Sequence, residues 1–133
     1  MSRQEIYKEI EEMCGMVPEQ FKVLTDETLE PSWQMFKRYQ MSEDTLIPPK
    51  YKQLIGLAVA GAIRCPYCTL FHTEASKLMG ATTAEIEEVA MLTRETAGWS
   101  AYLNTIRLDM ERFKSEVGQI VEFIKTKTLQ RGT

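Results

Sequence analysis

The segment LIGLAVAGAI, from Leu54 to Ile63, is the feature that most constrains the fold of this chain. A helix that is apolar on nearly every face has to be buried, and this one is too short to span a bilayer. Its many small residues would let neighbouring helices approach closely. The Cys65–Pro66 step that follows should interrupt the helix, because a residue before proline is pushed out of the α region. The sequence thus predicts a central buried helix followed at once by a second helix from Pro66 to about Gly80.

Helical signals cover most of the remaining chain. Alternating β-branched runs and Asn-Gly or Asp-Gly hairpin turns are absent. Pro48 and Pro49 mark a break before the central helix. Thr82 and Glu85 fit the capping box of a further helix start. We therefore expect an all-α fold of about six helices, with the Cys-x-x-Cys segment at the start of a central helix.

The C-terminal region carries a long apolar repeat with alternating spacings of four and three residues. The repeat comprises Trp99, Leu103, Ile106, Met110, Phe113, Val117, Ile120 and Ile124. This is an a/d heptad pattern, and it predicts one long C-terminal helix from about residue 98. The stripe could pack within the chain or against another subunit. Because so long a helix outreaches the core of a 133-residue chain, we expect a homo-oligomer.

Length and charge narrow the function classes. A chain of 133 residues predicts a single domain over residues 1–133. The net charge is −3 and no dense run of Lys and Arg occurs, which disfavours nucleic acid as a partner. The N-terminus lacks an apolar core of signal-peptide length, so we expect a cytoplasmic protein with no membrane partner. Thiols stay reduced in that compartment, which favours a catalytic or metal-binding role for paired cysteines.

Two cysteines and the chain's single histidine lie within AIRCPYCTLFHTEA. If Pro66 is the first helical residue, Cys65 is the N-cap, and the helix dipole there favours a thiolate. Cys68 lies one turn further on the same face, close enough for a disulfide. His72 follows Cys68 by four residues, so its imidazole could take or return the Cys68 proton. The segment is therefore a candidate thiol redox centre.

Other interpretations of the same residues remain open. Cys65, Cys68 and His72 could bind zinc, with Cys14 as a fourth ligand, although the spacing is tight for one tetrahedral ion. They could also be inert side chains in a structural helical module. Attachment of c-type haem would need histidine at the position of Thr69. The tetrapeptide CPYC is also typical of glutaredoxins, but the preceding segment is predicted as helix rather than strand.

A longer resemblance covers the chain from about Gly15 to Ala97. GMVPEQFKVL, followed by KYKQLIGLAVAGAIRCPYCTLFHTEASKLMGATTAEIEEV, resembles the carboxymuconolactone decarboxylase and alkylhydroperoxidase D family. The resemblance implies an all-α bundle assembled as trimers or hexamers. It implies reduction of peroxides or disulfides by the cysteine pair, with Cys68 attacking, Cys65 resolving and His72 acting as acid–base. No organic cofactor is implied, but a dithiol electron donor is required. A lactone decarboxylase-like lyase is the alternative, and its chemistry is not expected to depend on a Cys-x-x-Cys pair.

One position departs from the family pattern. The relay glutamate of the resemblance lies twelve residues before the first cysteine, which is Gln53 here. An amide can orient an imidazole or a water molecule, but it cannot carry a proton at neutral pH. The substitution should matter less for thiol–disulfide exchange than for rapid peroxide turnover. Cys14 lies outside the motif, where packing or an additional exchanging thiol are its expected roles.

Overall fold

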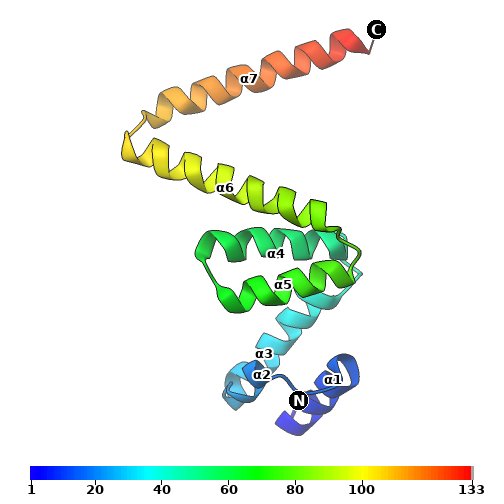
Figure 1. The fold of residues 1–133 in the computed structure, drawn as a ribbon. Coiled ribbons are helices and arrows are strands. Elements are labelled where there is room, and N and C mark those ends of the chain that lie inside the picture. The colour runs from blue at the N-terminus through cyan, green and yellow to red at the C-terminus, as the bar shows by residue number, and fades with distance from the viewer. Residues whose placement is uncertain (133) are drawn as a thin grey trace. The chain divides into compact units, whose positions relative to one another are not determined.

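The computed structural model describes residues 1–132, and within them it contains seven α-helices, one π-helical segment and no strand. In chain order the elements are α1 (Arg3–Cys14), α2 (Glu19–Lys22), α3 (Asp26–Phe36), η1 (Lys37–Met41), α4 (Pro49–Ile63), α5 (Pro66–Leu78), α6 (Thr83–Thr105) and α7 (Met110–Arg131). The all-α prediction is confirmed (Figure 1). Contacts divide the chain into two units, Met1–Thr93 and Arg94–Thr133, with the boundary inside α6.

The core of the first unit forms around Trp33 of α3. It comprises Ile6, Ile10, Val17, Phe21, Leu29 and Trp33. Phe21 meets the Trp33 ring edge-on at a centroid distance of 5.4 Å, a geometry that aromatic quadrupoles favour. The indole N–H of Trp33 donates to the Glu9 carboxylate at 3.1 Å, and Lys37 pairs with the same carboxylate. The Lys37 ammonium lowers the pKa of Glu9, so this buried indole has a charged acceptor.

Helices α4 and α5 lie side by side as an antiparallel pair (Figure 1). Arg64, in the left-handed region at φ 57°, ends α4, and α5 begins at Pro66. The predicted interruption at Cys65–Pro66 is therefore confirmed. The apolar composition of α4 predicts burial on every face, but only part of the helix is buried in the single chain. Gln53, Leu57 and Ala60 are buried, whereas one face leaves Ile55, Val59 and Ile63 exposed in the single chain.

The prediction of one continuous C-terminal helix from about residue 98 is wrong. Helix α6 begins at Thr83 and continues through position 98 to Thr105, and α7 begins only at Met110. Arg107 adopts φ 51° between them, and the Asp109 carboxylate caps α7 by accepting the Arg112 N–H at 2.7 Å. A left-handed residue followed by an N-cap ends one helix and starts another, although the apolar spacing continues across the break.

Helix α7 lies in the second unit and has no buried residue. Its apolar stripe remains exposed, at 69% for Met110, 39% for Phe113 and 57% for Ile120. None of the helices within residues 1–132 is long and apolar enough to cross a membrane.

Candidate functional site

The two cysteines of the motif meet at the N-terminus of α5. Cys65 is the N-cap, and its Sγ accepts the Cys68 backbone N–H at 3.2 Å. The two Sγ atoms lie 2.8 Å apart, and both thiols are free. A disulfide bond is about 2.05 Å long, so this is a reduced pair within hydrogen-bonding distance. The predicted N-cap position of Cys65 is confirmed.

The environments of the two thiols differ. The hydrogen bond with the Cys68 thiol, followed by the backbone N–H groups of Cys68 and Tyr67, lowers the pKa of Cys65. The same thiol–thiol hydrogen bond raises the pKa of Cys68. A negative charge on Cys65 also interacts favourably with the positive end of α5. The geometry thus favours a thiolate on Cys65, whereas the family resemblance implies that Cys68 attacks first.

His72 lies one turn after Cys68 and is buried, with 9% of its surface exposed. Its Nδ1 is 2.8 Å from Oε1 of Gln53, which is itself only 1% exposed. Burial lowers the pKa of His72, so the imidazole is neutral at neutral pH. The structure therefore brings Gln53 to His72, although these residues lie on different helices.

His72 is not hydrogen-bonded to either thiol in the described part of the chain. The expected proton transfer between His72 and Cys68 stays a prediction, based on their spacing of four residues on α5. A side chain at this spacing lies on the same helix face.

Two further residues complete the surroundings of His72 and were not predicted as site residues. The Gln40 backbone carbonyl accepts the Gln53 Nε2–H at 3.0 Å. A Cβ atom on Gly56 would lie 2.4 Å from Cε1 of His72 and 2.6 Å from both ring nitrogens. The stripe of small residues in α4 indicated a close approach of this kind. A backbone carbonyl leaves no comparable signal in a sequence.

Cys65 is reached from an open groove of about 740 Å³ at the junction of α4 and α5. Its lining comprises Gly61, Arg64, Cys65, Pro66, Thr69, Leu70 and Thr73. The rim combines aliphatic surface with hydroxyls and one guanidinium. Cys65 therefore borders a hollow that is open to solvent.

The described residues do not form the ligand cluster that the zinc interpretation requires. Among residues 1–132, no three or more His, Cys, Asp or Glu side chains are grouped closely enough to hold a metal ion. Cys14, the fourth ligand of that interpretation, is an exposed free thiol at the end of α1.

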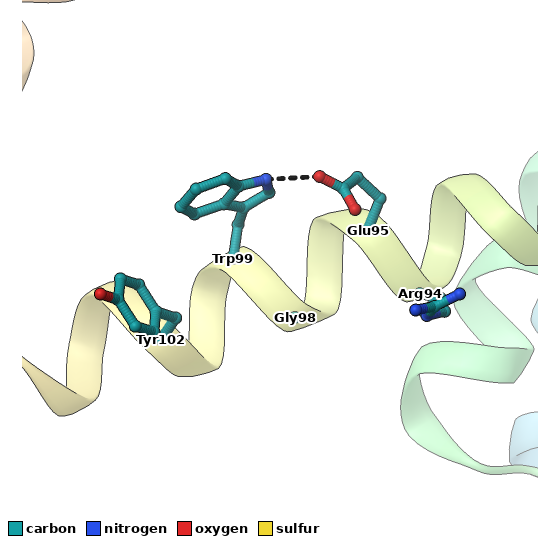
Figure 2. Close-up of a pocket in the computed structure, with 5 residues that line it drawn as sticks. All are labelled: Arg94, Glu95, Gly98, Trp99 and Tyr102. Carbon is teal, nitrogen blue, oxygen red and sulfur yellow. Dashed lines mark hydrogen bonds between the residues drawn. The ribbon is translucent and has the colours of Figure 1, made fainter.

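A second hollow lies on α6. It is open, measures about 440 Å³, and is lined by Arg94, Glu95, Gly98, Trp99 and Tyr102 (Figure 2). All five residues belong to successive turns of one helix, and the Trp99 indole N–H donates to Glu95. The arrangement contains no nucleophile and no buried titratable group, so it offers less chemistry than the cysteine site.

Two solved structures share the fold of this chain. A crystal structure of the alkylhydroperoxidase AhpD core from Rhodospirillum rubrum superposes with a TM-score of 0.71 at 26% identity, covering 83% of this chain and 84% of that one. A Burkholderia xenovorans protein, provisionally described as a carboxymuconolactone decarboxylase, superposes with a TM-score of 0.60 at 23% identity, covering 87% and 94% of the two chains. The second likeness concerns the fold alone.

Sequence comparison gives the family. Uncharacterized protein 4 in the cox locus of Paracoccus denitrificans is 34% identical over 59 residues, which is 44% of this chain and 53% of that protein. The match thus spans about half the length of that curated relative. The profile of the carboxymuconolactone decarboxylase family matches residues 31–109, which include α4, α5 and both cysteines. The chain belongs to the carboxymuconolactone decarboxylase family.

Proposed function

We propose that this protein is a thiol-dependent oxidoreductase that acts through the Cys65–Cys68 pair. The family and its solved structures support either a peroxidase-like or a decarboxylase-like function. The observation that favours thiol chemistry is the pair of free sulfurs 2.8 Å apart at a helix N-terminus. A decarboxylase-like lyase has no need for two adjacent thiols, whereas a redox cycle through an intramolecular disulfide requires them.

The oxidative half-reaction begins at Cys65. Its thiolate attacks the terminal oxygen of a hydroperoxide, the O–O bond breaks, and Cys65 becomes a sulfenic acid while the alkoxide leaves and is protonated to the alcohol. Cys68 then attacks the Cys65 sulfur and displaces hydroxide, which leaves as water after taking up the Cys68 proton. Cys68 is a thiol when this step begins, so the step needs a base. In this proposal His72 takes the Cys68 proton and passes it to the departing hydroxide, which leaves as water.

The reductive half-reaction returns both thiols. A thiolate of a partner dithiol attacks the Cys65–Cys68 disulfide, a mixed disulfide forms, and the second thiol of the partner releases it. The partner is oxidised to its disulfide, and both cysteines end as thiols. A disulfide substrate would be reduced by the same exchange in the opposite direction, with a dithiol donor restoring the pair.

We also propose that the protein works as a homo-oligomer. Helix α7 has no buried residue, and the face of α4 that carries Ile55, Val59 and Ile63 is exposed. Isolated amphipathic helices are marginally stable in water and gain most of their stability from packing. A trimer or hexamer, as the family resemblance implies, would cover these surfaces.

Mass spectrometry of the reduced protein tests the redox proposal. A Cys14→Ser background removes the exposed third thiol, and the protein is treated with one equivalent of an alkyl hydroperoxide or, separately, a small disulfide. We expect loss of two hydrogens with a Cys65–Cys68 linkage in the peptide map. If neither oxidant forms that linkage, the proposal is wrong.

Single-cysteine variants test the order of attack. Cys68→Ser leaves Cys65 alone and should accumulate a sulfenic acid that a dimedone-type reagent traps. Cys65→Ser should react more slowly, because only Cys65 occupies the N-cap, where its sulfur accepts a backbone N–H and the positive end of α5 favours a thiolate. The opposite result would assign the first attack to Cys68, as the family resemblance implies.

A further inference from the structure

We infer that Gln53, held by the carbonyl of Gln40, fixes the imidazole of His72 as the tautomer with its proton on Nδ1, so that Nε2 is the basic nitrogen of the site. Gln53 is then a positioning residue that acts through His72. The assignment of a catalytic purpose to this tautomer depends on the proposed thiol chemistry, but the tautomer itself does not.

The direction of the hydrogen bonds follows from the chemistry of the groups. A backbone carbonyl can only accept, so the group facing Gln40 must be the Nε2 amide of Gln53, at 3.0 Å. The other end of the same amide, Oε1, therefore faces His72 at 2.8 Å. An amide oxygen can only accept, so Nδ1 must carry the hydrogen. Flipping the buried amide would set its oxygen against the Gln40 carbonyl, acceptor against acceptor.

The π-helical segment explains why a carbonyl is available at this point. The last carbonyls of any helix lack partners within the helix, and Gln40 is the fourth of the five residues of η1. The backbone turns to an extended conformation at Ser42, whose N–H donates to Lys37. The carbonyl of Gln40 is left to accept from α4, and π-helical turns often occur at functional sites.

Position 53 must donate a hydrogen bond to the Gln40 carbonyl and accept one from His72. An amide can do both, whereas the carboxylate that the family resemblance places at this position can only accept. A glutamate at position 53 could still accept the Nδ1–H of His72. Its second oxygen, however, would face the Gln40 carbonyl with no hydrogen to share. The neutral amide satisfies both neighbours at once, and every buried side-chain nitrogen and oxygen in the described residues has a partner. Only Nδ1 of His72 is engaged by Gln53, and the amide at position 53 cannot carry a proton onward from the imidazole.

The single histidine makes the tautomer directly measurable. Long-range ¹H–¹⁵N correlation spectra of the reduced protein, at a pH where the imidazole is neutral, distinguish the protonated ring nitrogen from the free one. We expect Nδ1 to be the protonated nitrogen, which is the reverse of the preference of histidine in water. A spectrum of the unmodified protein with the proton on Nε2 would overturn the inference without any variant.

Two glutamine variants provide the matched comparison. Gln53→Leu removes the acceptor and should shift the tautomer ratio towards Nε2–H, with a slower closure of the Cys65–Cys68 disulfide. Gln40→Leu keeps the backbone carbonyl and should leave the tautomer ratio unchanged. An unchanged ratio in Gln53→Leu, or an equal shift in both variants, would contradict the role assigned to Gln53.

The two proposals fail separately in these experiments. A protein with the expected tautomer that forms no disulfide under either oxidant would refute the redox function and leave the tautomer assignment standing. A protein that forms the disulfide but carries its proton on Nε2 would refute the assignment alone.

Discussion

Replacing Gly56 with alanine tests the packing that holds His72 in place. The added Cβ would lie 2.4 Å from Cε1 of His72, whereas carbon atoms in contact are about 3.5–4.0 Å apart. The imidazole would have to move by about 1 Å to restore a normal contact. Such a shift would break or distort the hydrogen bond between Nδ1 and Gln53.

The expected loss of stability can be worked from three contributions. Alanine in place of glycine in a helix interior gains about 1 kcal/mol. Overpacking of a filled site costs about 1–3 kcal/mol, and leaving buried hydrogen-bonding groups unpaired costs about 1–3 kcal/mol. The net free energy of unfolding should therefore fall by about 1–5 kcal/mol, against the gain that helix propensity alone would give.

Gly61 of the same helix provides the matched control. Its added Cβ would lie 3.4 Å from Cγ2 of Thr93, close to an ordinary contact. Gly61→Ala should be neutral or stabilising by up to about 1 kcal/mol. Denaturant unfolding measures both variants at one protein concentration, since the proposed assembly would make apparent stability depend on concentration. Equal stabilisation of the two variants would refute the close approach of His72 to Gly56.

Three other substitutions test the remaining framework. Glu9→Ala should cost about 1–3 kcal/mol more than Glu9→Gln, because only glutamine keeps an acceptor for the Trp33 indole. The pKa of Glu9 is lowered in the folded protein. The stabilisation from its charge is therefore complete above the unfolded-state pKa and is lost as the pH falls through the folded-state pKa. In urea unfolding, the difference in stability between the unmodified protein and Glu9→Gln should shrink in acid. Asp109→Ala removes the cap of α7 and should lower helicity by circular dichroism, at a cost of about 1 kcal/mol. Ile120→Lys on the apolar stripe should reduce the mass measured by light scattering, whereas Ser115→Lys on the opposite face should not.

Local signals in the sequence predicted the parts of the fold that depend on neighbouring residues. Pro66 fixes a helix start, and the cap at Cys65 follows from it. Thr82 and Glu85 form both hydrogen bonds of the predicted capping box, at 3.1 and 2.8 Å. In each case the physical cause lies within three or four residues, so no knowledge of the tertiary structure was needed.

The break between α6 and α7 shows what apolar spacing leaves undetermined. The a/d repeat records which residues share an apolar face, but it does not record whether the backbone between them is continuous. Arg107 in the left-handed region and the cap at Asp109 interrupt the helix without disturbing that spacing. The available signal for a new helix start was Asp109, a residue type that favours the N-cap. It was weaker than the signal of the long apolar repeat.

The candidate site was predictable in its side chains and not in its backbone. Cys65, Cys68, His72 and Gln53 are distinguished by residue type and spacing, whereas the contact of Gln53 with His72 joins two helices and appears only in the folded structure. The carbonyl of Gln40 has the same chemistry at every position of a chain. Its role depends on where η1 ends and α4 lies, which only the folded structure reveals.

The proposed reaction contains two tasks that one imidazole could perform together: stabilising the thiolate of Cys65 and taking the proton of Cys68. The charge on Cys65 is stabilised by the end of α5 and by the neighbouring thiol, without help from His72. In the proposed reaction, Cys68 enters the second step as a thiol and therefore needs a base. In a His72→Ala variant we therefore expect sulfenic acid at Cys65 to form at a nearly unchanged rate and to persist, because closure of the disulfide slows. Rapid-quench trapping with a dimedone-type reagent measures both steps. If the variant slows formation of the sulfenic acid as much as disulfide closure, His72 activates the first thiol as well, and the separation of tasks is wrong.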